Sequence, residues 1–200
     1  DAMLMGAEMA YTAKNYEKAL TIYKQLKDKA ASMERRQLAK TGMLRSAHML
    51  GNGEEIILAA TDLLADTKLA PELSNEAHYY RAKAYLDASK TEAAMEDLKV
   101  LAKDTRNVYG AEAKYKVAQI YFDGGQTDKA EQEVLNYIEV STPHTYWLAR
   151  SFVLLADVYM KLGRNLDAKQ YLLSLKQNYQ ADDDIAGMIE SRLEKLKIEN

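Results

Sequence analysis

Two stretches of sequence decide the fold: Ala111–Ala130 is AEAKYKVAQIYFDGGQTDKA, and Ala149–Ala168 is ARSFVLLADVYMKLGRNLDA. Both contain an alanine, a tyrosine three residues later, a glycine four residues after that, and a second alanine five residues after the glycine. The same skeleton recurs upstream in a more degenerate form, and its final positions are Ala19, Ile56, Ala94, Ala130 and Ala168. They are spaced by 37, 38, 36 and 38 residues, so one unit repeats along nearly the whole chain.

Each unit predicts two helices joined by a tight turn. Apolar or aromatic residues follow the final position at offsets of four and seven, as Val134 and Tyr137 follow Ala130, which places them on one helix face. A short polar or glycine turn interrupts each unit near Lys14-Asn15, Gly51-Asn52, Ser89-Lys90, Gly124-Gly125 and Gly163-Arg164. Only two prolines occur in 200 residues, so little material is left for long loops. The sequence therefore predicts an all-α chain of eleven helices with no strand.

The skeleton resembles the tetratricopeptide repeat (TPR), and Phe152, Leu155, Ala156, Tyr159 and Ala168 match that pattern well. The period exceeds the usual length of about 34 residues, and the glycine of the first helix is replaced by Ala or Leu. The resemblance implies a right-handed superhelical solenoid of about five helix-turn-helix repeats over residues 1–180 and a C-terminal capping helix over residues 181–200. The expected repeats lie near 1–35, 36–72, 73–108, 109–144 and 145–180.

Long repeats of this kind resemble those of bacterial cell-envelope TPR adaptors. This resemblance implies a bacterial periplasmic or cell-envelope protein. Because the first helix starts abruptly at Asp1, we also expect further TPR repeats N-terminal to it in a longer chain.

Composition argues against several classes of function. Lys and Arg number 27 and Asp and Glu 30, with no long run of one sign, which argues against nucleic-acid binding. No apolar run approaches the roughly 18 residues of a membrane helix, so membrane insertion is not expected. The chain has no cysteine, and His48, His78 and His144 are far apart, so no metal site is expected. In the absence of a catalytic or phosphate-binding motif, we expect neither enzymatic activity nor a cofactor.

The concave face of the expected solenoid is lined by the first helix of each repeat. The resemblance places two inward-facing sets there: Leu4, Thr41, Tyr79, Tyr115 and Val153, and Tyr11, His48, Leu86, Phe122 and Met160. Aromatic and cationic side chains often dominate binding surfaces. The predicted groove residues are Tyr79, Tyr80, Lys83, Tyr115, Lys116, Phe122 and Arg150. The alternative is that some of these rings pack between repeats, as is expected of the skeleton residues Tyr85, Tyr121 and Tyr159.

The sequence thus predicts a non-catalytic scaffold that binds a peptide or protein segment in its concave groove. One alternative is a structural or oligomerisation module that uses the apolar N-terminal residues Met3, Leu4 and Met5. Another is an accessory region of an enzyme encoded upstream. The Lys and Asn set with which chaperone-binding family members hold a terminal carboxylate is missing, since Thr41 and Tyr79 stand where Lys is needed.

Overall fold

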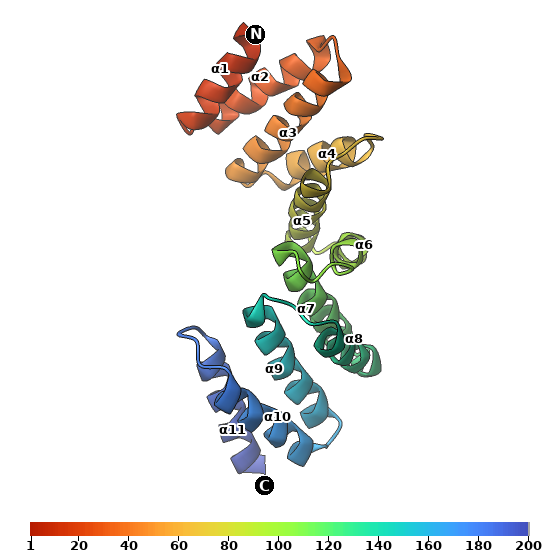
Figure 1. Ribbon diagram of the computed structural model, residues 1–200, viewed down its shortest axis with the longest axis vertical. Helices are drawn as coiled ribbons and strands as arrows, with labels where there is room; N and C mark the ends of the chain where they lie inside the picture. The colour runs from red at the N-terminus through yellow and green to blue at the C-terminus, as the bar shows by residue number, and fades with distance from the viewer. Residues whose placement is uncertain (200) are drawn as a thin grey trace. The chain divides into compact units, whose positions relative to one another are not determined.

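The computed structural model describes residues 1–199, and these form eleven α-helices and no strand (Figure 1). The all-α fold class is therefore confirmed. The helices are α1 (Ala2–Thr12), α2 (Tyr16–Lys29), α3 (Met33–Leu50), α4 (Gly53–Leu64), α5 (Pro71–Asp87), α6 (Thr91–Leu101), α7 (Val108–Asp123), α8 (Thr127–Val140), α9 (Thr145–Lys161), α10 (Asn165–Asn178) and α11 (Ile185–Glu199).

The five hairpin turns fall where the sequence predicts them, and each contains one residue in the left-handed backbone region. These residues are Lys14, Gly51, Ser89, Gly125 and Gly163, with φ between 59° and 79°. Each precedes the final skeleton position of its repeat by five residues. A left-handed conformation costs nothing for glycine but strains a residue that carries a Cβ. Because Lys14 and Ser89 adopt it too, closure of the hairpin imposes this geometry whatever residue stands there.

The skeleton alanines form the cores of the helix pairs. Ala118, Ala130, Ala156 and Ala168 are at most 1% exposed and belong to one hydrophobic cluster with Leu155 and Leu172. Antiparallel helices approach to about 8–10 Å only where the side chains between them are small. The recurring alanine is therefore explained by close helix packing within each repeat.

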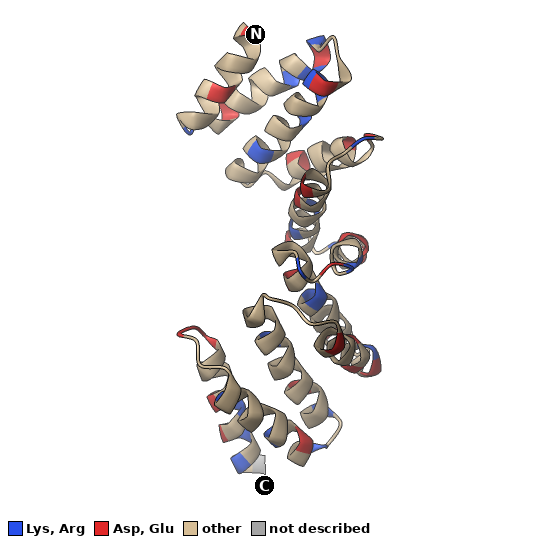
Figure 2. Ribbon diagram, in the orientation of Figure 1, with Lys and Arg blue, Asp and Glu red and all other residues tan. Residues whose placement is uncertain are grey.

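The chain divides into two compact units, Asp1–Val100 and Leu101–Asn200. In the first unit α2 packs on α3 and α4 packs on α5. In the second unit α9 is central, because it contacts α7, α8, α10 and α11. Basic and acidic residues are scattered over the helices of both units (Figure 2).

In the second unit, side-chain hydrogen bonds link consecutive repeats. The Thr105 hydroxyl donates to the carbonyl of Ser141 at 2.7 Å, and the Thr142 hydroxyl donates to the carbonyl of Thr105 at 2.6 Å. Partners in these two bonds are separated by 36 and 37 residues. The separation equals one repeat, so the connection after α6 is fastened to the connection after α8.

A buried carboxylate joins α5 to α6 in the first unit. The Asp97 side chain is 1% exposed and accepts hydrogen bonds from Arg81 Nε at 2.9 Å and Arg81 Nη2 at 2.7 Å. His78 Nδ1 lies 2.7 Å from the same carboxylate. Burial pushes the pKa of Asp97 up, but the bonds to His78 and Arg81 outweigh it and hold this pKa below its usual value.

Candidate functional site: a pocket between α7, α9 and α11

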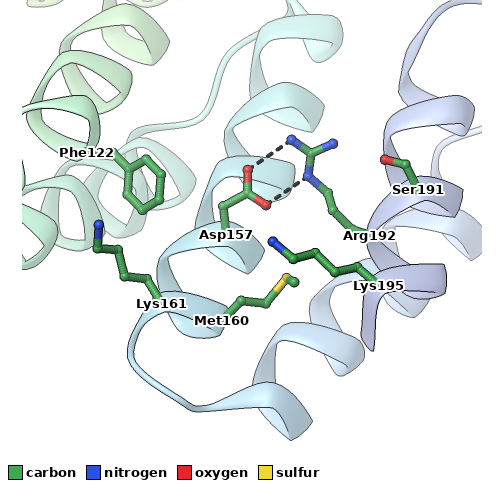
Figure 3. Close-up of a pocket in the computed structure, with 7 residues that line it drawn as sticks. All are labelled: Phe122, Asp157, Met160, Lys161, Ser191, Arg192 and Lys195. Carbon is green, nitrogen blue, oxygen red and sulfur yellow. Dashed lines mark hydrogen bonds and ion pairs between the residues drawn. The ribbon is translucent and has the colours of Figure 1, made fainter. Parts of the chain in front are cut away.

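In the second unit, the first helices of successive repeats, together with α11, enclose a pocket of about 600 Å³. It is lined by Phe122 from α7, by Asp157, Met160 and Lys161 from α9, and by Ser191, Arg192 and Lys195 from α11 (Figure 3). The pocket thus combines apolar surface with cationic side chains. Pockets with a few convergent polar groups are the usual place for a ligand.

An ion pair between Asp157 and Arg192 fixes one wall of the pocket. Arg192 Nε lies 2.8 Å from Asp157 Oδ1, and Arg192 Nη2 lies 3.0 Å from Asp157 Oδ2, so the guanidinium binds the carboxylate through two parallel hydrogen bonds (Figure 3). Arg192 Nη1 also donates to the carbonyl of Met188 on its own helix, at 3.2 Å. This pair holds α11 against α9 and neutralises the only carboxylate among the lining residues.

The apolar part of the pocket consists of Phe122 and Met160, which are half-buried and pack against the core. Lys161 Nζ lies 5.7 Å from the centroid of the Phe122 ring, within the range of a cation–π contact. Lys195 is exposed and forms no ion pair with any side chain that the structure describes, and the same holds for Lys161. Figure 3 shows these two lysines on opposite sides of Met160.

Of the predicted groove residues, Phe122 alone lines this pocket. The prediction that Tyr115 is exposed is wrong: Tyr115 is 7% exposed and belongs to the core cluster. Tyr115 and Phe122 are seven residues apart on α7 and share a face. They differ in what covers them, because the Trp147 ring lies 5.7 Å from the Tyr115 ring and the guanidinium of Arg150 lies 5.2 Å from it.

Arg150 acts as a bridge between tyrosines. Its Nε donates to the Tyr115 hydroxyl at 3.2 Å and its Nη1 to the Tyr146 hydroxyl at 3.0 Å. Tyr146 in turn donates to the carboxylate of Asp184, at 2.9 Å, in the segment before α11. Burial raises the pKa of Tyr115 although the charge of Arg150 opposes this. Arg150 therefore packs the repeats together beside the pocket.

Lys116 does not reach the pocket lining, since it forms an ion pair with Glu112 one turn earlier on α7, at 2.5 Å. The skeleton tyrosines also differ from expectation. Tyr159 is 4% exposed, as predicted, but Tyr85 and Tyr121 are only half-buried. A cation lies over each ring, with Arg81 Cζ 5.9 Å from the centroid of the Tyr85 ring and Lys129 Nζ 5.6 Å from that of the Tyr121 ring.

The remaining predicted residues, Tyr79, Tyr80 and Lys83, lie on α5 in the first unit and form a separate cluster. Lys83 Nζ lies 4.9 Å from the centroid of the Tyr79 ring. The Tyr80 ring stacks on His48 of α3, with centroids 4.0 Å apart and planes inclined by 11°. Burial, with a contribution from the charge of Lys83, lowers the pKa of His48. His48 was one of the inward-facing positions expected from the sequence.

Comparison with known proteins agrees with the fold. A sequence profile described as the tetratricopeptide repeat matches residues 1–32. The matched stretch contains α1 and α2, the first helix pair of the chain. No curated protein matches this chain.

Solved structures show the same fold. A structure described as the MamA protein is 16% identical, covers 90% of this chain and 95% of its own, and has a TM-score of 0.67. A Podosopora anserina protein, described as a kinesin light chain with nearly identical TPR-like repeats, is 17% identical over 88% of this chain and 92% of its own, with a TM-score of 0.59. A tetratricopeptide repeat protein from Parabacteroides merdae ATCC 43184 is 16% identical over 98% of this chain and 85% of its own, with a TM-score of 0.57. These likenesses support the all-α superhelical repeat fold.

Neither a cluster of metal-binding side chains nor a membrane-spanning helix is found in the described residues. Among them no group of three or more His, Asp or Glu side chains is placed to hold a metal ion. No helix within residues 1–199 is long and apolar enough to cross a bilayer.

Proposed function

We propose that this protein is a non-catalytic scaffold that binds a peptide or protein segment along its first helices, with the pocket between α7, α9 and α11 as one contact. The TPR fold generally serves as a scaffold for protein–protein interactions. The observation that carries the proposal is the half-buried Phe122 ring, which lines the pocket together with two lysines that have no described ion-pair partner. Partly exposed aromatic anchors in pockets are typical of binding hot spots.

A random peptide library tests this proposal. Peptides selected on the wild-type chain should bind the Phe122→Ala variant at least about tenfold more weakly, because the apolar ring is lost. The matched control is Tyr171→Ala, which removes another half-buried aromatic ring, from α10, that lies outside the pocket. Thermal unfolding of both variants must show that they are folded. Equal binding by wild type and Phe122→Ala would contradict the proposed site.

Self-association is the second candidate function, and the exposed face of α1 favours it. Of the N-terminal apolar residues, Met3 and Leu4 are half-buried against the core, whereas Met5 and Met9 are 61% and 66% exposed. Exposed apolar clusters often mark contact surfaces. Light scattering over a range of protein concentrations tests this candidate. A concentration-dependent mass that Met5→Lys removes would support it, and a monomer at all concentrations would exclude it.

The absence of enzymatic activity and the bacterial cell-envelope setting belong to the proposal as well. A thermal-shift screen with Zn²⁺, Ca²⁺ and nucleotides tests the first, since a ligand at about a hundredfold excess over its Kd stabilises a fold by roughly 2.7 kcal/mol. One reproducible shift would count against a purely non-catalytic scaffold. Cell fractionation of the source organism tests the second.

A further inference from the structure

The pocket between α7, α9 and α11 has a local charge opposite to that of the whole protein. The chain carries a net charge of -3. The lining residues include three cations and a single carboxylate, and that carboxylate is neutralised by Arg192 at 2.8 and 3.0 Å. The two lysines remain, one from α9 and one from α11. A cleft lined by one sign of charge attracts ligands of the opposite sign.

Two negative groups lie close in sequence to the lining residues but are not among them. The carbonyls of the last turn of α9, which carry the negative end of the helix dipole, accept hydrogen bonds from Leu162, Gly163 and Arg164. Asp123, next to Phe122 on α7, accepts a hydrogen bond from Gln119 Nε2 at 2.8 Å. Among the described lining residues, the charges of Lys161 and Lys195 therefore remain without a carboxylate partner.

The donors of the pocket are side chains and not backbone groups. All seven lining residues lie within helices, where the backbone N–H groups are consumed by intrahelical bonds. A terminal carboxylate is held by a nest of free backbone N–H groups or, in chaperone-binding TPR proteins, by a set of Lys and Asn side chains, and the described lining residues offer neither free N–H groups nor an Asn. Lysine ammonium groups act instead as mobile point charges suited to single carboxylates. The pocket thus fits Asp or Glu side chains within a chain better than a chain terminus.

We propose that this pocket binds an internal acidic peptide segment: an apolar side chain rests on Phe122 and Met160, and neighbouring Asp or Glu carboxylates pair with Lys161 and Lys195. The placement of the two lysines on either side of Met160 matches this arrangement of charges around an apolar residue (Figure 3). The inference rests on the proposed function and specifies the class of partner. The bidentate bond to Asp157 makes Arg192 a positioning residue, which holds α11 and hence Lys195 beside the pocket.

The test uses random peptides displayed without a free C-terminus, selected on the full chain. Wild type should enrich peptides with an apolar residue flanked by Asp or Glu. The charge-reversed variant Lys161→Glu/Lys195→Glu should bind a synthetic copy of an enriched peptide at least about tenfold more weakly. The matched control is Lys103→Glu/Lys169→Glu, which changes the net charge equally at two exposed lysines outside the pocket and should stay within about twofold of wild type. Added salt should weaken wild-type binding.

The outcomes separate the two proposals. Enriched peptides that are neutral or basic, or unchanged affinity in Lys161→Glu/Lys195→Glu, would overturn the acidic-segment inference while leaving a Phe122-dependent scaffold intact. Acidic peptides that bind only through a free C-terminus, in a parallel library that exposes it, would overturn the assignment to internal segments. If no peptide depends on Phe122, the proposed function fails and the inference fails with it.

Discussion

The left-handed turn residue of each repeat permits a test in which one chemical change has opposite effects at two sites. Gly163 lies in the turn between α9 and α10 with φ 76°, and Gly187 lies in the first turns of α11. A Cβ added at either position would meet no neighbouring atom within 4 Å. Replacement by alanine therefore probes the backbone alone, without a steric contribution from packing.

The expected signs follow from backbone preferences. Alanine at position 163 reduces the conformational entropy of the unfolded chain, which stabilises the fold by about 0.4–1 kcal/mol. In the folded protein, however, it must adopt a left-handed conformation that costs roughly 1–2 kcal/mol. Gly163→Ala should therefore lower the free energy of unfolding by about 0.5–1 kcal/mol. Alanine is favoured over glycine within a helix, so Gly187→Ala should raise the free energy of unfolding by about 0.5–1 kcal/mol.

Urea unfolding followed by tryptophan fluorescence measures both effects in the same unit. The chain has a single tryptophan, Trp147, and it lies in the second unit together with both glycines. The two variants should separate by about 1–2 kcal/mol with wild type between them. Two shifts of the same sign would refute the assignment of a left-handed backbone to position 163, and with it the common turn geometry of the repeats.

Four other variants test the packing and the buried polar groups by urea unfolding. Ala168→Leu should destabilise by about 1–3 kcal/mol through overpacking of the α9–α10 contact, and an unchanged midpoint would show that this alanine is not confined. Tyr115→Ala should cost about 3–5 kcal/mol as a buried aromatic, whereas a cost below about 1 kcal/mol would restore it as a groove residue. The pKa of Asp97 is held below its ordinary value, so the ionised carboxylate stabilises the fold fully above about pH 4, and this stabilisation is lost as pH falls through the folded pKa. Asp97→Asn should therefore lower the free energy of unfolding by about 1–3 kcal/mol near neutral pH and by less in acid. A loss that does not depend on pH would contradict this. Burial raises the pKa of Tyr137 to about 12 and its hydroxyl donates to the carbonyl of Ala111, so wild type should lose stability as pH rises from about 10 to 12, and Tyr137→Phe should lose less. Parallel alkaline curves for those two proteins would contradict the role of the hydroxyl.

The helix pairs could be predicted because their determinants are local and periodic. The final skeleton position, which is alanine in four of the five repeats, and the turn residue five positions before it recur with the repeat, so the sequence displays the same constraint several times. The left-handed backbone at Lys14 and Ser89 could not be predicted from those residues themselves. It follows only from their equivalence to Gly51, Gly125 and Gly163.

The candidate site was harder to predict because its residues depend on contacts between helices that the period does not encode. Tyr115 and Phe122 share a face of α7, and residues of α9 determine how far each is buried. Trp147 packs against Tyr115, whereas Asp157 and Met160 line the pocket beside Phe122. Three lining residues come from α11, which follows the last full repeat and has no equivalent copy from which to infer its register. The two hydrogen bonds between Arg192 and Asp157 place α11 beside α9, and no pattern in the sequence indicates this pairing.

The hydrogen bonds between repeats also have a kinetic consequence. Side-chain hydrogen bonds between repeats of the second unit span about one repeat, with 38 residues between Tyr146 and Asp184 and between His144 and Arg106. Because these partners lie only one repeat apart, the entropy cost of bringing them together during folding is modest, and local contacts favour fast folding. Folding can therefore start at any helix pair and spread to its neighbours. A destabilising substitution in one repeat is expected to cause local unfolding of that repeat before the others unfold.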